Sequence, residues 1–411
     1  MRIPCQKQSV IMPSSSTLQR HSPRAFFAQF SGPVLLTLTL LIATSCGSEP
    51  PVRFTETETG VAYANEVITA IPWSIHIVRI DRGNPGLSLH SVHAQGNALG
   101  LETLSQQIQR AGSALGVPVA AVNGDFYQRE RAYAGDPRGL QIAEGELLSA
   151  PNGGVSFWLD AAGKPQIAAV TAQFQVTWSD GTTTPFGLNE ERKPDGLVLY
   201  SPSLGASTHT IGGRELVLVP DGGSSSLHLG DNFRAKVHEI RETGDTSLKG
   251  GTLVLSAGPA LMKQLPKLDS GAVVMFSTTT QPALNGTRTA IGGGPVLVKQ
   301  GHVQKIRPPS ADSYEFSSMI ERHPRTALGW NDKYFFLVEV DGRQKQLSVG
   351  MTLEELAVFL KRLGCEEAMN LDGGGSATLW FDGQVRNRPC DGSERPVANA
   401  LLVTRKVNNQ P

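Results

Sequence analysis

The chain has 411 residues, and its 37 Lys and Arg balance its 37 Asp and Glu, so the formal net charge is zero. A balanced charge lacks the basic surface that nucleic-acid binding requires, and no nucleic-acid partner is expected. The apolar share, 39% of residues, is typical of a globular protein with a substantial core. The 44 glycines favour a β-rich or α+β fold with many turns.

The N-terminal segment resembles an export signal. A positively charged stretch precedes an apolar run, Pro33–Ala43, that is too short to span a bilayer and fits a secretory signal peptide. The run ends in ATSC, where Cys46 resembles the lipidation site of a bacterial lipoprotein; ordinary secretion is the alternative. We therefore expect a signal peptide over 1–45, a polar tether over 46–59, and an extracytoplasmic protein. It is either a cell-envelope lipoprotein, held to the membrane by lipid at Cys46, or secreted.

Two of the four cysteines are candidates for a disulfide. Cys5 leaves with the signal, and if Cys46 carries lipid, Cys365 and Cys390 remain as an even pair in an oxidising compartment. A bond between them would close a loop of about 25 residues and contribute about 3 kcal/mol in the chain-entropy model. Two buried free thiols are the alternative.

The first half of the chain alternates strand and helix patterns. Ile71–Asp81 and Leu87–Ala94 alternate apolar and polar residues as strands do, whereas Leu101–Gly116 has helical spacing and ends at a glycine. Val117–Val122 is a short apolar strand. From about 140 to 290, short strands separated by Asp-Gly and Ala-Gly turns indicate antiparallel sheet.

The second half contains a strand pair at Ala290–His302, then a hairpin at Thr326–Arg343 that turns at Asn331 and Asp332. A helix follows over Thr352–Cys365; it begins with a capping box, in which Thr352 caps the helix and Glu355 lies three residues later. The last strand is expected in Arg395–Val407.

Two helix–strand units end in acidic turns. The first ends at Asn123 and Asp125, and the second at Asn370 and Asp372. If the two strands lie side by side, both pairs meet at one rim. Paired carboxylates act on glycosidic bonds or hold a hard cation, and a metal role stays open. The alternative for each aspartate is an ordinary turn.

Two runs of three glycines, Gly292-Gly293-Gly294 and Gly373-Gly374-Gly375, are candidates for anion-binding backbone. Arg325 and Arg395 are the expected arginine partners, since the guanidinium fork matches phosphate. A β-bulge, a structural ion pair of Arg325 and a surface pair of Arg395 with Glu394 are the alternatives. Neither run is a P-loop, because no Lys follows the glycines.

Several motifs in fixed order resemble a known family. They are NGDFY, PRGLQIAEGEL, IGGGPVLVKQG, RTALGW, NLDGGGSATLW and ERPVANALLV. Together they resemble the phosphodiester glycosidase domain, over about Gly60 to Val407. The resemblance implies an α+β fold in a single large domain over 60–407, with a mixed, mostly antiparallel sheet and few helices. No cofactor is expected.

The resemblance also implies an activity, hydrolysis of an α-sugar-1-phosphodiester. Carried over by position, Asp372 is the catalytic carboxylate, Asp125 its partner, and Arg325 holds the phosphate. Asn123 orients sugar hydroxyls, and Ser376 is a further donor to the substrate. The expected binding site is completed by Arg395 and by five glycines: Gly293, Gly294, Gly373, Gly374 and Gly375.

The expected substrate is a phosphodiester-linked glycan of an envelope or extracellular polysaccharide. Two rival functions stay open: an envelope protein that binds anionic glycan without catalysis, and a metal-dependent phosphodiesterase that cuts the P–O bond. The absence of a histidine cluster in the sequence disfavours a transition-metal site for the latter.

Overall fold

A computed structural model describes residues 52–58, 60–96, 98–129, 131–307 and 318–406. The described residues belong to one compact unit, and residues 1–50 lie outside the described part. The predicted signal peptide and Cys46 are therefore not described. No helix among the described residues has the length and apolarity needed to cross a membrane.

An eight-stranded sheet forms one layer of the structure, with strand order β1-β2-β3-β21-β20-β22-β18-β19. Its strands are β1 (Thr55–Glu58), β2 (Val61–Ile68), β3 (Trp73–Asp81), β18 (Val296–Lys299), β19 (His302–Val303), β20 (Arg325–Trp330), β21 (Tyr334–Val340) and β22 (Glu367–Asn370). β1 pairs with β2, so part of the predicted tether is strand instead. A polar strand of this kind suits the solvent-exposed edge of a sheet, which explains why its sequence resembles a tether.

A five-stranded sheet, ordered β24-β23-β5-β25-β4, packs against the first. Its strands are β4 (Leu87–His93), β5 (Val117–Asn123), β23 (Leu379–Phe381), β24 (Gln384–Val385) and β25 (Asn399–Arg405). The core between the sheets takes Val78 and Leu337 from the first, and Val122 and Leu401 from the second. The alternation of faces along each strand explains this pattern, because every second side chain points into the gap.

One helix covers the outer face of each of these sheets. α3 (Leu353–Arg362) buries Leu356 and Phe359 against the eight-stranded sheet, and α1 (Leu104–Leu115) buries Leu104 and Ile108 against the five-stranded sheet. The capping box of α3 is confirmed, since the Thr352 hydroxyl accepts from the Glu355 peptide N–H. The layers therefore run helix, sheet, sheet, helix.

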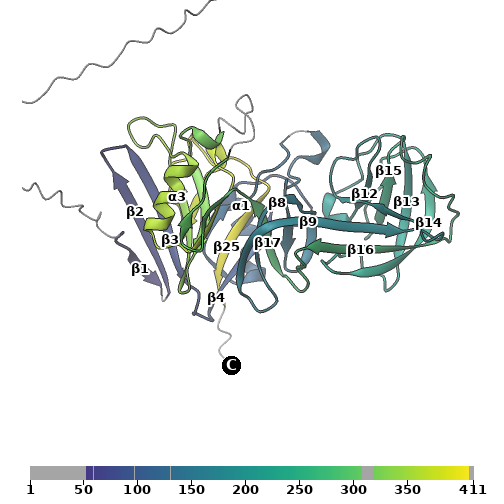
Figure 1. The fold of residues 1–411 in the computed structure, drawn as a ribbon, viewed down its shortest axis with the longest axis horizontal. Coiled ribbons are helices and arrows are strands. Elements are labelled where there is room, and N and C mark those ends of the chain that lie inside the picture. Colours follow the sequence, from purple (N-terminus) through teal and green to yellow (C-terminus); the bar gives the residue numbers. More distant parts are fainter. Residues whose placement is uncertain (1–51, 59, 97, 130, 308–317, 407–411) are drawn as a thin grey trace, which may run out of the picture. The chain divides into compact units, whose positions relative to one another are not determined.

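The middle of the chain forms a larger, strongly curved sheet with its own core. Its strands are β6 (Gln141–Ala143), β7 (Glu146–Ser149), β8 (Asn152–Leu159), β9 (Pro165–Thr177), β10 (Thr183–Pro185), β11 (Gly187–Leu188), β12 (Leu197–Tyr200), β13 (Arg214–Pro220), β14 (Asn232–Arg241), β15 (Leu253–Ala257), β16 (Val273–Gln281) and β17 (Thr289–Gly293). The long strands β9 and β16 lie side by side (Figure 1). Short 3-10 helices occur at Arg131–Tyr133, Pro202–Leu204 and Gly374–Ser376.

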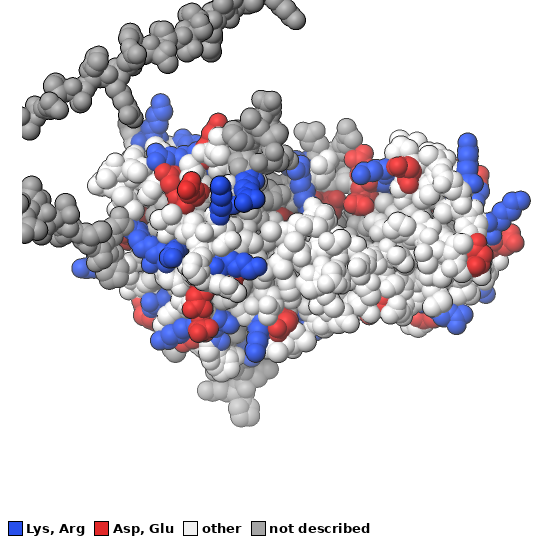
Figure 2. Space-filling model, in the orientation of Figure 1, with Lys and Arg blue, Asp and Glu red and all other residues white. Residues whose placement is uncertain are grey.

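The described fold is dominated by strands, and β11–β12 is the one parallel pair among the described strand pairings. The expected antiparallel character is confirmed, whereas the α+β label overstates the helices. Lys, Arg, Asp and Glu are interspersed over the face shown in Figure 2, as the balanced composition suggests.

Candidate active site

The two acidic turns meet, but across two sheets instead of within one. β5 leads to Asp125 from the five-stranded sheet, and β22 leads to Asp372 from the eight-stranded sheet. The peptide N–H of Asp372 donates to the carbonyl of Gly124 over 2.9 Å. The expected meeting of the two turns is therefore confirmed, while the lateral pairing of their strands is wrong.

Hydrogen bonds of the Asn123 side chain hold the two acidic turns together. Its Nδ2 donates to the Asp372 carbonyl over 2.7 Å, and its Oδ1 accepts from the Thr326 hydroxyl (2.7 Å) and the Thr378 peptide N–H (3.0 Å). The side chain is 0% exposed. The predicted contact of Asn123 with sugar hydroxyls is therefore wrong: this amide is consumed inside the protein and positions Asp372.

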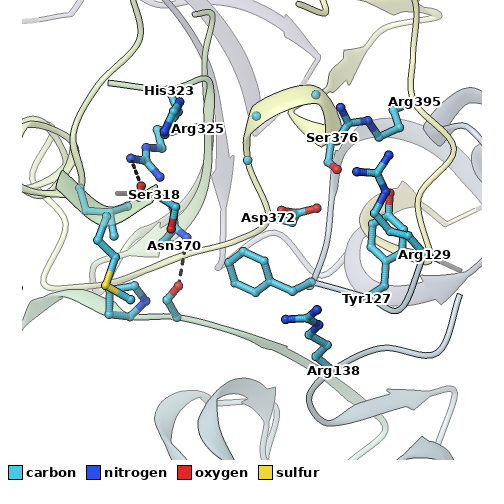
Figure 3. Close-up of a pocket in the computed structure, with 18 of the residues that line it drawn as sticks. Tyr127, Arg129, Arg138, Ser318, His323, Arg325, Asn370, Asp372, Ser376 and Arg395 are labelled. Carbon is cyan, nitrogen blue, oxygen red and sulfur yellow. Dashed lines mark hydrogen bonds between the residues drawn. The ribbon is translucent and has the colours of Figure 1, made fainter. Parts of the chain in front are cut away.

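A pocket of about 420 Å³ opens beside Asp372 (Figure 3). Its walls come from the loop after β5, the end of β17, the segment before β20, and the loops after β21 and β22. Predicted residues that line it are Gly294, Arg325, Asp372, Gly373, Gly374, Gly375, Ser376 and Arg395. Lining residues outside the prediction include Phe126, Tyr127, Arg129, Arg138, His323, Arg343 and Asn370. Asn123, Asp125 and Gly293 do not line it.

Asp372 is the carboxylate exposed to this pocket. Burial raises its pKa to about 6, against the opposing effects of the Ser376 hydroxyl, the Gly373 peptide N–H and the charges of Arg395 and Arg129. Desolvation penalises the charged form of a carboxyl group, whereas these neighbours favour it. The group is therefore charged at neutral pH yet close enough to its pKa to exchange a proton.

Asp125 lies beneath the pocket. Its carboxylate accepts from the peptide N–H groups of Phe126 (2.7 Å) and Gly139 (2.9 Å), and burial, with a smaller contribution from the charge of Asp372, raises its pKa to about 7. A Cβ added to Gly292 would stand 2.2 Å from Asp125 Oδ2. Gly292 therefore makes room for this carboxylate. Asp125 influences Asp372 through charge and the shared backbone, and the structure does not place it against a substrate.

The run Gly373–Gly375 brings other chain segments close to bare backbone. Gly374 has a φ of +62°, and a Cβ on Gly375 would meet Arg395 Nη2 at 1.8 Å. Two of its three N–H groups are engaged inside the protein: Gly374 donates to the Pro324 carbonyl (2.9 Å), and Gly373 favours the charged form of Asp372. The glycines also let Arg395 approach the backbone, and a role of this run in anion binding stays a prediction.

The run Gly292–Gly294 has its N–H groups taken up in backbone pairing. Gly292 and Gly293 pair with β8, and the Gly294 N–H donates to the Asn370 carbonyl over 2.8 Å. A Cβ on Gly293 would stand 2.7 Å from the same carbonyl. These glycines permit close packing between β17 and β22, so the predicted role in anion binding is wrong.

Arg325 lines the pocket but is committed to main-chain carbonyls. Its Nε donates to Met351 O (2.8 Å), and its Nη2 donates to Ser318 O (2.6 Å) and Glu321 O (2.9 Å). The side chain is buried. Arg325 thus holds the rim segments of the pocket in place, and the predicted phosphate contact fits other arginines better.

Arg129 and Arg138 are those arginines. Both side chains lie near Asp372 (Figure 3), and neither guanidinium makes a hydrogen bond or ion pair with any residue that the structure describes. Arg395 also faces the pocket, held by Asp391 through bonds of 2.6 and 3.0 Å. Arg395 therefore pairs with Asp391 and not with Glu394, whose carboxylate accepts from the Ser105 N–H.

Two buried polar atoms at the pocket, Ser376 Oγ and Asn370 Oδ1, form no hydrogen bond of ordinary geometry within the described ranges. The Ser376 hydroxyl nevertheless lies close enough to Asp372 to favour its charged form. The Asn370 amide nitrogen donates to Gly294 O over 3.0 Å, which fixes the side chain. Buried polar atoms are almost always hydrogen-bonded in proteins, so both atoms point to ligand groups that would complete them. His323 also lines the pocket, where burial and the charges of Arg325 and Arg343 lower its pKa.

Cys365 and Cys390 are free thiols. Cys365 belongs to the core between α3 and the eight-stranded sheet. Cys390 donates to Asp391 Oδ1 over 3.5 Å and influences Glu339, whose side chain points to the opposite face of that sheet. The predicted disulfide is therefore wrong, because the sheet separates the two sulfurs.

Fold and site together define a β-dominated protein with an arginine-lined pocket that contains one carboxylate, Asp372. Residues 230–404 match the family described as phosphodiester glycosidase. The bovine N-acetylglucosamine-1-phosphodiester α-N-acetylglucosaminidase is 30% identical over 166 residues, 36% of this chain and 31% of that protein. The expected resemblance to this family is therefore found over residues 230–404, less than half of the chain. Asp372, Arg325 and Arg395 lie in the matched range, and Asp125, Arg129 and Arg138 lie outside it.

Further similarities are partial. The SPbeta prophage-derived protein YomE of Bacillus subtilis is 32% identical over 120 residues, 29% of this chain and 18% of that protein. The chain thus spans less than a third of the length of these relatives. A solved structure of a hypothetical protein from Synechocystis shares the fold with a TM-score of 0.69, at 22% identity over 87% of this chain and 64% of that one.

Proposed function

We propose that the protein hydrolyses the glycosidic bond of an α-sugar-1-phosphodiester in an envelope or extracellular polysaccharide. The observation that carries the proposal is one pocket in which Asp372 lies near Arg129 and Arg138, two arginines without partners among the described residues. A glycosyl phosphodiester presents the matching pair of features, an anion beside an electrophilic anomeric carbon.

The arginines bind the phosphate in this proposal. Arg129 and Arg138 hold its non-bridging oxygens from two sides, and Arg395, oriented by Asp391, adds a third positive charge. Ser376 Oγ and Asn370 Oδ1, which form no hydrogen bond of ordinary geometry in the described structure, take the sugar hydroxyls. The anomeric carbon then lies over Asp372.

Asp372 is the single carboxylate in the pocket lining of the described structure, and the proposed chemistry needs no second one. The bond between C1 and the phosphate oxygen breaks, the phosphomonoester leaves with the bonding electrons, and water finally supplies the hydroxyl at C1. A phosphate is a good leaving group, so its departure requires less acid assistance than that of an alkoxide. The ionised Asp372 assists as nucleophile or as base toward water.

The location follows from the N-terminal pattern. Export by residues 1–45 and lipid at Cys46 would place the pocket outside the cytoplasm, where envelope and extracellular polysaccharides with phosphodiester links occur. A cell fractionation of the full chain, with mass analysis of the mature N-terminus, tests this part of the proposal.

The activity is tested by incubating the purified protein with a panel of α-sugar-1-phosphodiesters, including UDP-sugars, and following products by NMR. Release of free sugar, lost in Asp372→Asn and retained in the exposed control Asp332→Asn, supports the proposal. Release of sugar-1-phosphate would move the cut to the P–O bond and favour a phosphodiesterase. Binding without turnover across the panel would favour a glycan-binding protein.

A further inference from the structure

Three ionisable side chains occupy core positions between the eight-stranded and five-stranded sheets. His76 on β3 and Glu339 on β21 are directly opposed across the two strands, and Asp341 follows two residues later on the same face. They are 4%, 0% and 2% exposed, respectively. Their neighbours on this face of the strands, such as Val78 and Leu337, are apolar core residues. Burying three ionisable side chains in an apolar core is costly, so their presence there calls for an explanation.

The geometry of the three groups is that of a ligand set. One nitrogen of His76 and one oxygen each of Glu339 and Asp341 lie within 4.8 Å of one another. The His76 ring also has a fixed orientation, because its Nδ1 lies 2.7 Å from the Tyr63 hydroxyl while its Nε2 lies 3.2 Å from Asp341 Oδ2. A partner on the remote ring nitrogen is the usual arrangement around a metal-bound histidine.

Glu339 is the second, independent observation. Neither of its carboxylate oxygens makes a hydrogen bond of ordinary geometry in the described structure, although the side chain is completely buried and the Asn387 amide lies near enough to favour its charged form. Asp341, by contrast, accepts from the Arg388 peptide N–H over 2.8 Å as well as contacting His76. A proton on Glu339 could be shared with the neighbouring Asp341 carboxylate, but it would still leave the second carboxyl oxygen of Glu339 without a partner among the described residues.

We propose that His76, Glu339 and Asp341 bind one divalent transition-metal ion, with Zn²⁺ the favoured occupant. One imidazole and two carboxylates suit Zn²⁺, with Mn²⁺ a weaker alternative by ligand type. The ion neutralises the two carboxylates and gives Glu339 its missing partner. Nothing in this proposal depends on the proposed glycosidase activity.

The site is structural, because none of its ligands lines the pocket. It joins β3 to β21, and Asp341 also holds the Arg388 N–H at the start of the segment that carries Asp391 and Arg395. Metal binding would thus stiffen one wall of the active pocket from behind. A loss of activity in chelator would then report on this support and would not by itself indicate catalysis by metal.

The test uses the full purified chain, stripped with chelator and dialysed, then titrated with ZnCl₂, MnCl₂ or CaCl₂. We expect about one Zn²⁺ per chain by elemental analysis after gel filtration, as a single site requires, and a rise in Tm on adding ZnCl₂. Glu339→Gln should lose both effects, whereas Glu354→Gln, which removes an exposed carboxylate on α3, should keep both.

The metal-free proteins provide a second readout. Glu339→Gln removes an orphaned buried acid, so without metal its Tm should equal or exceed that of the wild type. If that variant does not fold, Tyr63→Phe replaces it: loss of the Tyr63 hydroxyl should weaken Zn²⁺ binding about 10-fold, in line with other partners of metal-bound histidines. A wild-type chain that retains no ion and shows no Tm change with any of the three salts overturns the proposal. Binding that survives in Glu339→Gln overturns it too.

Discussion

Replacing Asp372 by Asn should abolish catalysis and yet stabilise the fold at neutral pH. The carboxylate is held in a pocket that disfavours its charge, and its pKa is raised from 3.8 to about 6. An amide of the same shape removes the charge without opening a cavity. The fold is thus expected to become more stable at the residue on which the proposed activity depends, a stability–activity trade-off seen at other active sites.

The magnitude follows from the shift. A displacement of about 2 pKa units corresponds to about 3 kcal/mol between the charged and neutral forms. Because the folded pKa is raised, the folded state keeps this proton between about pH 4 and pH 6 while the unfolded chain has released it. The free energy of unfolding therefore falls as pH rises through this window and levels off above about 6. The advantage of Asp372→Asn should be absent near pH 4 and approach about 3 kcal/mol at pH 8.

Urea unfolding followed by circular dichroism at five pH values from 4 to 8 measures this. Asp125 titrates in both proteins, so the difference between their stability curves isolates most of the contribution of Asp372. The control is Asp332→Asn, which replaces an exposed carboxylate in the β20–β21 turn, far from the pocket lining. If the difference curve of Asp372→Asn is flat from pH 4 to pH 8, Asp372 is not held in a desolvated environment, and the reasoning about its reactivity is wrong.

The remaining predictions concern the neighbours of this carboxylate. Arg138→Ala should raise KM for a sugar phosphodiester by about 10-fold or more, the effect of losing a charge-assisted hydrogen bond of about 1.5–3 kcal/mol, with a smaller change in kcat; equal KM values for variant and wild type would exclude Arg138 from phosphate binding. Asn123→Ala leaves the Thr326 hydroxyl and a peptide N–H unpaired, and it should lower the free energy of unfolding in urea by about 1–3 kcal/mol and reduce activity. An unchanged free energy of unfolding would show that the hydrogen bonds of Asn123 are dispensable. Dithiothreitol should leave Tm unchanged, because Cys365 and Cys390 are free; a drop in Tm would show that they pair.

Local sequence signals predicted local structure well. The capping box at Thr352 and Glu355 marked the start of α3, and the turn at Asn331 and Asp332 marked the β20–β21 hairpin. Such features depend on residues a few positions apart, whose hydrogen bonds form whatever the rest of the chain does. Asp372 was predicted to be at the site for the same reason, since it lies in a dense motif and at the end of a strand.

The incorrect and missed predictions share one cause: each depends on contacts between residues far apart in the sequence. Asn123 looked like a surface polar residue beside Asp125, but its partners come from Thr326 and Thr378, far along the chain. Arg129 and Arg138 were missed because an arginine in a loop carries no periodicity, and only folding places both near Asp372. The Cys365–Cys390 pairing failed because cysteine counting is blind to a sheet that lies between the two sulfurs.

The pocket lies at the interface of two sheets, which explains how Asp372 can be charged and still be partly shielded from solvent. A turn at the end of a single sheet would be open to solvent on one side, and its carboxylate would titrate normally. Here the Asp372 N–H and carbonyl are both bound by the opposite sheet, through Gly124 and Asn123, so the turn is drawn into the interface. Arginines from loops on either side can then offset the charge without touching the scaffold bonds. The backbone bonds thus keep Asp372 in the position where burial raises its pKa, and Asn123 contributes to this environment without lining the pocket.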